Sequence, residues 1–249
     1  MSRWSARRTF LVVGAVAAVT ALSVAQGIQQ HVGNDFHVFW QAGRNFTTGS
    51  PLYHDYLPGA RQFKYPPFAA LLFQLLGVFP LRVAAVLFSM LNLGLWVAAV
   101  YLIRDIVTRT FPDRNPAPLP LLLAAVFSAQ FFLDNFHHVQ MNGAVFVLVL
   151  LGIRAHLLGR NVWAAASLVA ATAIKLTPIF FVLWLLVRGR PRASLAVPPL
   201  ALACLLLPLL VRGPTTGVAE LREYYHSFIE GHQRGEVSTY HSNQNLGAL

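Results

Sequence analysis

Residues 83–103 read VAAVLFSMLNLGLWVAAVYLI, an apolar run without a charged side chain that is long enough to cross a membrane as one helix. Further apolar runs predict spans elsewhere in the chain, at residues 10–25, 119–133, 143–153 and 193–211. The composition agrees, because 56% of the residues are hydrophobic and 11% are charged, whereas soluble domains carry about 25% charged residues. We therefore predict an all-α, polytopic integral membrane protein, with a single membrane domain over residues 1–249 embedded in a lipid bilayer.

The arginines between the apolar runs predict which way the chain crosses the membrane. Arg3, Arg7 and Arg8 precede the first predicted span and place the N-terminus in the cytoplasm by the positive-inside rule. The alternative is a cleaved signal peptide, since Ser23-Val24-Ala25 resembles a small-x-small cleavage site. Both interpretations place the residues from His31 onward outside the cytoplasm, so both predict the same outer face.

The placement of the basic residues and the cysteine content exclude three possibilities. The formal net charge is +10, but the basic residues lie in short clusters between apolar runs. This pattern is a topology signal and not the basic stripe of a nucleic-acid-binding protein, so we expect no nucleic-acid partner. The one cysteine, Cys204, lies in an apolar run, which excludes an intrachain disulfide framework and a metal–thiolate cluster.

The apolar run at residues 66–79 is short for a span, and we expect it to lie along the outer interface as a helix. The cytoplasmic side then holds eleven of the nineteen basic residues and two acids, Asp105 and Asp113, for a net charge of +9. If the run spanned the membrane instead, two arginine-containing loops would move outside, against the positive-inside rule. The predicted parts are an outer loop with an interfacial helix over 28–82, a helical bundle over 83–211 and a second outer loop over 212–249.

A lysine interrupts the apolar stretch at residues 162–187. Lys175-Leu176-Thr177-Pro178 contains a proline, which removes a helical hydrogen bond and disfavours helix at the residue before it. We predict two short helices that meet at Lys175. A charge at membrane depth costs about 2.5–3.5 kcal/mol on insertion scales, so this ammonium needs a partner. An anionic phosphate is the expected one, and the alternative is that the side chain snorkels to the interface.

Four separate segments are expected to converge on the outer face, and their polar residues suit chemistry on a sugar or a phosphate. Asp35 can take a proton from a sugar hydroxyl as a general base, or it can close an Asx turn or cap a helix. His137 and His138 can bind a phosphate or a sugar, or pack as polar residues; two adjacent histidines are a poor metal pair, so we expect no metal site. Gln140 and Asn142 can hydrogen-bond a sugar or cap the helix that follows.

Aromatic residues of the first outer loop have two alternative roles. Tyr53 and Tyr65, with their aromatic neighbours, suit an interfacial belt and also a platform for a sugar ring or a lipid chain. Lys64 joins Lys175 as the second lysine on this face. The chain contains no Walker loop, GxSxG, HExxH or Rossmann glycine pattern, so a nucleotide held in a standard soluble fold is not expected.

Short motifs along most of the chain carry a resemblance to a known family. The first three are Asp35-Phe36-His37-Val38-Phe39-Trp40-Gln41-Ala42-Gly43, Gly49-Ser50-Pro51-Leu52-Tyr53 and Phe63-Lys64-Tyr65-Pro66-Pro67-Phe68. Later come Gln140-Met141-Asn142, Lys175-Leu176-Thr177-Pro178 and Asn243-Gln244-Asn245-Leu246, where Asn245 replaces the serine of the family's motif. In this order they resemble glycosyltransferase family 87, which are polyprenyl-phosphate-mannose-dependent mannosyltransferases with a GT-C fold.

The resemblance implies a GT-C-like helical bundle and a membrane glycosyltransferase. Mannose is the sugar that the enzyme is expected to move, from a polyprenyl-phosphate donor to a glycolipid or glycan acceptor on the extracytoplasmic face. No cofactor and no bound metal are expected, because the lipid-linked sugar is itself the donor substrate. The resemblance makes Asp35 the catalytic base. The expected phosphate-binding residues are Lys175, Lys64, His137 and His138, and the expected sugar- or acceptor-binding residues are His37, Tyr53, Tyr65, Gln140, Asn142, Asn243 and Gln244.

Length separates this chain from the family that it resembles. Members of the family continue through several more membrane helices, so we expect the chain to lack the C-terminal membrane helices, and an inactive fragment is one alternative. The other alternative is a non-enzymatic protein that binds or translocates a lipid phosphate with the same basic and aromatic face. Transporters more often show internal repeats and charges at mid-membrane, and we find no repeat here.

Overall fold

The computed structural model describes residues 20–22, 24–29, 35–53, 63–112, 133–135, 137–188 and 190–230. All regular structure in these residues is helical, and they contain no β-strand. The helices are α2 (Asp35–Thr48), α3 (Pro67–Gly77), α4 (Leu81–Thr110), α6 (Asn142–Leu157), α7 (Asn161–Ile174), α8 (Ile179–Val187), α9 (Pro191–Arg212), α10 (Pro214–Tyr224) and the π-helix η1 (Tyr225–Glu230).

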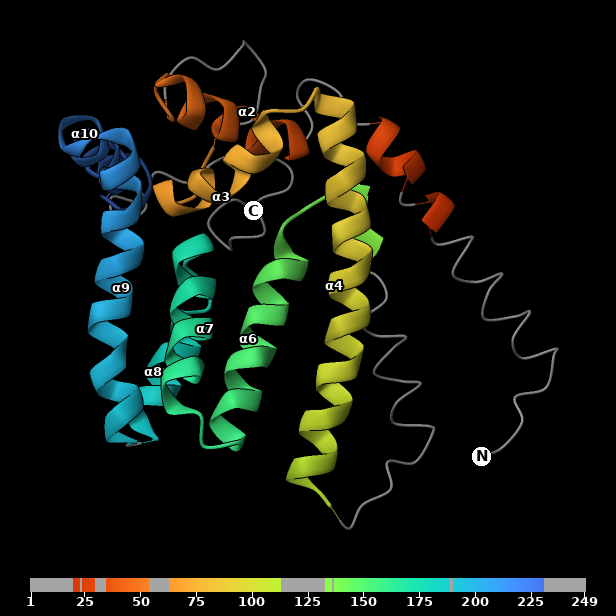
Figure 1. Cartoon of the computed structure of the whole chain (residues 1–249), viewed down its shortest axis with the longest axis vertical. Helices are drawn as coiled ribbons and strands as arrows, with labels where there is room; N and C mark the ends of the chain where they lie inside the picture. Colours follow the sequence, from red (N-terminus) through yellow and green to blue (C-terminus); the bar gives the residue numbers. More distant parts are fainter. Residues whose placement is uncertain are drawn as a thin grey trace, which may run out of the picture.

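Long helices form a row, and shorter ones gather at one end of it (Figure 1). Helix α4 packs on α6, α6 on α7 and α7 on α9. Helices α2, α3 and α10 lie at the end that is uppermost in Figure 1, which we call the upper end. The C-terminal end of α4 and the turns that join α6 to α7 and α8 to α9 lie at the opposite, lower end.

Two of the described helices, α4 and α9, are long and apolar enough to cross a membrane. Only 6% of the most apolar 18-residue stretch of α9 is buried inside the protein, so most of this helix has no protein covering it. Exposed leucines such as Leu195 and Leu210 are normal when the surrounding solvent is lipid, and costly when it is water. In the described residues, the prediction of an all-helical structure with helices long and apolar enough to cross a membrane is confirmed, whereas the number of spans and their direction stay predictions.

The segment at residues 66–79 forms the short helix α3, with Pro67 in its first turn, where a missing N–H leaves no hydrogen bond unmade. Figure 1 shows α3 lying across the upper end instead of running beside α4 and α6. It contacts α2, α4, α7, α9 and α10 there. This placement is the one expected of an interfacial helix, although its depth in a bilayer stays a prediction.

The predicted break at Lys175 is confirmed, since α7 ends at Ile174 and α8 begins at Ile179. The predicted span at 83–103 is confirmed as a helix, and α4 extends it to Thr110. The span at 119–133 lies outside the described residues except for Leu133. Most of the span at 10–25 also lies outside them, but residues 20–22 and 24–29 are helical.

Both predicted outer loops contain helices that the sequence did not indicate to us. The first loop contains α2, which buries Phe36, Phe39 and Trp40 against its neighbours. The second loop begins with α10 and η1, which continue the chain as helix to Glu230. Tertiary packing stabilises these helices in segments whose polar and glycine content suggested a loop. Helix α2 does so with its aromatic face, whereas α10 buries Gly217 and Glu220, and Tyr224 and Phe228 pack against the core.

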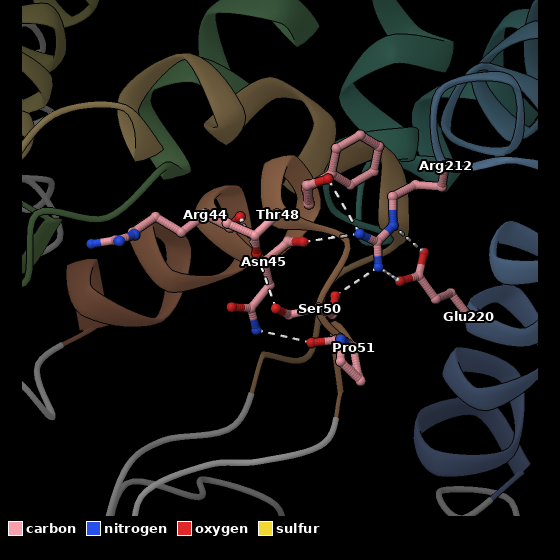
Figure 2. A network of polar contacts seen from close by, with 8 residues as sticks. Arg44, Asn45, Thr48, Ser50, Pro51, Arg212 and Glu220 are labelled. Carbon is pink, nitrogen blue, oxygen red and sulfur yellow. Dashed lines mark hydrogen bonds and ion pairs between the residues drawn. The ribbon is translucent and has the colours of Figure 1, made fainter.

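A glycine contact and a buried arginine hold α2 in place. Gly43 of α2 and Gly77 at the end of α3 bring the two backbones so close that a Cβ on Gly43 would lie 2.3 Å from the Phe73 carbonyl oxygen. At the other side of α2, Arg212 donates to the carbonyl oxygens of Asn45, Phe46 and Ser50 and pairs with Glu220 of α10 (Figure 2). Helix α2 is therefore fixed to α3, α9 and α10 together.

Candidate functional site

The first residue of α2, Asp35, contacts the turn that precedes α6. The Gln140 side chain donates from Nε2 to Asp35 Oδ2 over 2.9 Å, across 105 positions of the sequence. The Asp35 side chain is 14% exposed, so it is largely shielded from solvent. The two segments that carried the acid and the amide in the sequence therefore meet in the fold.

Two further hydrogen bonds connect Gln140 to Lys175, at the break between α7 and α8. Asn142 donates from Nδ2 to Gln140 Oε1 over 2.5 Å, and Lys175 donates from Nζ to Asn142 Oδ1 over 2.8 Å. We call the four residues Asp35, Gln140, Asn142 and Lys175 the polar relay. It joins a carboxylate on α2, two amides at the start of α6 and an ammonium between α7 and α8.

The backbone conformation of two residues, Lys175 and Val139, positions side chains of the polar relay. Lys175 directly follows the last residue of α7 and has an extended backbone (φ −144°, ψ 128°), and Pro178 directly precedes α8. Val139 has φ +49°, in the left-handed region that β-branched residues rarely adopt. Such a conformation costs roughly 1–3 kcal/mol and persists only where its surroundings fix it, often at functional sites. Here it turns the chain so that Gln140 faces Asp35.

A buried asparagine supports the same turn from α4. Asn92 donates from Nδ2 to the Gln140 carbonyl oxygen over 3.0 Å, and the Gln140 N–H donates to the Asn135 carbonyl oxygen over 3.0 Å. Both backbone groups of Gln140 are therefore held while its side chain reaches Asp35. Asn92 is 1% exposed. We did not predict its role from the sequence, although an amide inside an apolar span is a signal that could have identified it.

Tyr65 lies near both charged ends of the polar relay. Lys175 Nζ is 6.0 Å from the centre of the Tyr65 ring, which is within the range of a cation–π interaction. Burial and, secondarily, the nearby Asp35 charge raise the pKa of Tyr65 to about 12, so its hydroxyl stays neutral at physiological pH. The site therefore has an aromatic ring beside its cation, and the expected role of Tyr65 toward a sugar or a lipid chain stays a prediction.

The two histidines occupy different environments. His138 lies between two carboxylates, with Nδ1 3.7 Å from Asp35 Oδ2 and Nε2 3.4 Å from Asp134 Oδ1. His137 is exposed and stands edge-on to His138. This arrangement places His138 at the carboxylate end of the polar relay rather than beside Lys175, so its expected role toward a phosphate stays a prediction.

Three other predicted site residues lie away from the polar relay, and two lie beyond the described chain. His37 is buried against Trp40, and this burial lowers the pKa of its ring. Tyr53 is buried too, and its hydroxyl donates to the Tyr65 carbonyl oxygen over 2.9 Å. Lys64 is exposed and takes no part in the relay. Asn243 and Gln244 lie outside the described residues.

The site combines a carboxylate with an ammonium. An ionised carboxylate can take a proton from a hydroxyl, and an ammonium can stabilise an oxyanion. Lys175 is half-buried, and among the described residues no carboxylate lies within ion-pair distance of it. No group of three or more possible metal ligands occurs in the described part of the chain. The expectation that the site needs no cofactor stays untested.

Comparison with known proteins identifies the family that the sequence matches. The model of glycosyltransferase family 87 matches residues 63–249. This range includes Gln140, Asn142 and Lys175, whereas Asp35 lies before it. No solved structure matches the chain.

Mycobacterial enzymes are among the relatives. A polyprenol-phosphate-mannose-dependent alpha-(1-2)-phosphatidylinositol mannoside mannosyltransferase of Mycobacterium tuberculosis is 29% identical over 67% of this chain and 41% of its own. The protein of the same description from Mycolicibacterium smegmatis is 28% identical over 86% of this chain and 51% of its own. An alpha-(1->3)-arabinofuranosyltransferase of Mycobacterium tuberculosis is 24% identical over 90% of this chain and 54% of its own. The chain thus spans about half the length of the curated relatives that it matches.

Proposed function

Because the chain belongs to glycosyltransferase family 87, we propose that it transfers a sugar, with mannose the first candidate, from a polyprenyl-phosphate donor to the hydroxyl of a glycolipid or glycan acceptor. Two relatives are described as polyprenol-phosphate-mannose-dependent mannosyltransferases, which supports this donor. The observation that carries the proposal is the polar relay, which unites a carboxylate and an ammonium from distant segments in one site.

In the proposed reaction, the Asp35 carboxylate takes the proton of the acceptor hydroxyl. The acceptor oxygen forms a bond to the anomeric carbon of the donor sugar while the bond from that carbon to the phosphate oxygen breaks. The polyprenyl phosphate leaves with the bonding electrons, and the Lys175 ammonium stabilises the charge that develops on it. Direct displacement of this kind inverts the anomeric configuration.

Surroundings of the polar relay suit these two roles. Asp35 is partly open and accepts a hydrogen bond from a neutral amide, which stabilises its carboxylate without cancelling its charge. The Lys175 ammonium has three N–H donors, and one of them donates to Asn142. The half-buried position strengthens its attraction for a phosphate, because a low local dielectric reduces screening. The neighbouring Tyr65 ring offers a face to a sugar or an isoprenoid.

The proposed orientation places this site outside the cytoplasm. At the lower end, opposite the polar relay, lie Arg104, Arg109, Arg154, Arg160, Arg188, Arg190 and Arg192. The one acid at this end among the described residues is Asp105, which pairs with Arg109 and Arg154. The positive-inside rule favours a cytoplasmic position for such an end. The upper end then faces outward, as a multi-pass arrangement with an extracytoplasmic site requires.

A second sugar is also a candidate. The match to the arabinofuranosyltransferase covers 90% of this chain, more than either mannosyltransferase match does. Both sugars would be attacked at their anomeric carbon, so the roles of Asp35 and Lys175 would be the same. The contacts that distinguish a pyranose from a furanose would involve the sugar hydroxyls and not the phosphate.

The test is to identify the product that the chain forms in membranes. Membranes containing the protein are incubated with an endogenous glycolipid fraction and one of three labelled donors: polyprenyl-phosphate mannose, polyprenyl-phosphate arabinofuranose or a nucleotide-linked mannose. We expect label in glycolipid from the first donor and none from the nucleotide-linked sugar. Label from the second donor alone would correct the sugar. Tight donor binding with no transfer from any donor would replace the proposal with a lipid-phosphate binding protein.

A further inference from the structure

The chemistry of the two ends fixes the direction of every hydrogen bond in the polar relay. An ionised carboxylate only accepts, so Gln140 must turn its NH₂ group toward Asp35. An ammonium only donates, so Asn142 must turn its carbonyl toward Lys175. The remaining contact then runs from the Asn142 NH₂ group to the Gln140 carbonyl, as the structure has it. No other orientation of the two amides satisfies both ends.

This direction has an electrostatic consequence. Each amide presents its positive end to the carboxylate side and its negative end to the ammonium side, so the two aligned dipoles favour both charged forms. The amides also keep the charges apart. A direct ion pair between Asp35 and Lys175 would occupy the carboxylate that must accept a proton and the ammonium that must meet a phosphate.

We propose that Gln140 and Asn142 are positioning residues, a polar spacer that couples phosphate binding at Lys175 to proton acceptance at Asp35 while preventing the two charges from pairing. The proposal deepens the proposed function and rests on it. A different role would have each amide contact the sugar independently. Under our proposal, in contrast, a change in either amide alters the properties of the residue at the far end of the polar relay.

The spacer is held rigidly enough to transmit such a change. The backbone of Gln140 is fixed at both its N–H and its carbonyl, by Asn135 and Asn92. Val139 is 1% exposed and locked at a positive φ immediately before it. Asn142 is the first residue of α6, so its backbone belongs to a packed helix. Rotation of the side-chain amides is therefore the movement left to the spacer, and the polar relay restrains it.

A substitution of Asn142 by aspartate tests the coupling. The carboxylate introduced at this position would pair with Lys175 and could no longer donate to Gln140. Gln140 would then turn its NH₂ group toward the new carboxylate and its carbonyl toward Asp35, a contact that only a protonated Asp35 satisfies. Among the residues that the structure describes, the other ionisable groups near Asp35 are His138 at 3.7 Å and Tyr65, and Asp134 contacts the far side of the His138 ring. All of these stay in place in the variant.

For Asn142→Asp we expect the donor KM to rise about tenfold, and the acidic limb of the pH–kcat profile to move to higher pH by about 1 unit. The matched control is Asn161→Asp, the same change at the lower end, where Arg190 accommodates a carboxylate. The control should leave both quantities unchanged. A raised KM with an acidic limb at the wild-type pH would show that the amides act separately and would overturn the proposal.

A second variant keeps the proposal testable if Asn142→Asp does not fold, and it needs no transfer reaction. Gln140→Met removes both relay hydrogen bonds of that side chain without adding charge. Polyprenyl phosphate in detergent micelles is the probe, and its affinity reports on Lys175, which Gln140 does not touch. We expect the affinity to fall about fivefold or more. If Gln140→Met bound polyprenyl phosphate as tightly as the wild type does, the spacer proposal would be overturned. Failure of the proposed function would be a different result, in which the wild-type protein binds the probe but transfers no sugar.

Discussion

At the scale of single residues, the carboxylate of Asp35 is distinguished by what surrounds it. An amide and an imidazole contact it, and the lysine of the polar relay is two side chains away. In contrast, the other half of the upper end is built around a direct ion pair. Arg212 and Glu220 have side chains that are 2% and 5% exposed, and Figure 2 shows the guanidinium enclosed between Glu220 and the carbonyl end of α2. The first arrangement suits a charge used for chemistry, and the second uses its charges for stability.

The Arg212 ion pair gives a prediction about stability. Arg212→Ala leaves Glu220 buried without this cation and also removes the donors to the carbonyl oxygens of Asn45, Phe46 and Ser50. We expect the free energy of unfolding to fall by about 3–5 kcal/mol, because breaking a buried pair leaves an uncompensated charge. The measurement is thermal unfolding in detergent. Arg222→Ala, at a less buried position on α10, serves as the control, and equal midpoints for the two variants would contradict the prediction.

Residue identities in the site were largely predictable, but their partners were not. Asp35, Gln140, Asn142 and Lys175 each stand out in the sequence as polar residues near apolar runs. Their hydrogen bonds join positions that are 105 and 33 apart, and no local pattern encodes which side chains meet. Tyr53 shows the complementary difficulty. The sequence suggested an aromatic available to a ligand, whereas packing against Phe63, Tyr224 and Phe228 places it in the core.

At the scale of helices, backbone-breaking residues were a better guide than polarity. The proline after Lys175 predicted the two short helices α7 and α8 correctly, because its effect on the backbone is local. Helix α2 was missed because its stability is not local. Its aromatic face packs on α3, and the helix passes so close to α3 that glycine is required at the crossing. Such an approach depends on a partner that is distant in the sequence.

The crossing of α2 and α3 gives a prediction about packing. A Cβ on Gly43 would lie 2.3 Å from the Phe73 carbonyl oxygen, so Gly43→Ala must separate the helices. We expect a loss of about 1–3 kcal/mol in the free energy of unfolding, and a lower rate of sugar transfer because α2 carries Asp35. Gly94→Ala is the matched control in α4, where a Cβ meets no atom of the described residues within 4 Å.

Thermal unfolding of the two alanine variants decides whether the crossing is tight. The control variant should be unchanged or more stable by about 0.5–1 kcal/mol, since alanine favours helix over glycine. If Gly43→Ala were as stable as Gly94→Ala, the close approach of α2 to α3 would be wrong, and with it the account of how Asp35 is positioned.

At the scale of the whole molecule, the two ends of the helix row have different chemistry. The upper end contains the polar relay and the buried Arg212 pair, whereas arginines crowd the lower end. The separation follows from the charge pattern of the sequence, which predicted a basic face and a reactive face. Helix α9 runs between the two ends, packs on α7 along one side and leaves most of its apolar residues exposed. A site at one end of an apolar row suits a substrate with a polar head and a long apolar tail.

The measurement that tests the central claim most directly separates donor binding from transfer in two single variants. Binding of polyprenyl-phosphate mannose and its single-turnover transfer are measured in the same membranes for the wild type, Asp35→Asn and Lys175→Met. We predict that Asp35→Asn binds the donor within about twofold of wild type while transfer falls by about 10²–10⁴-fold. Lys175→Met should lose about tenfold or more in donor affinity, because it lacks the charged donor to the phosphate. Wild-type transfer by Asp35→Asn, or the same loss of binding in both variants, would contradict the assignment of a base and a phosphate-binding cation to one site.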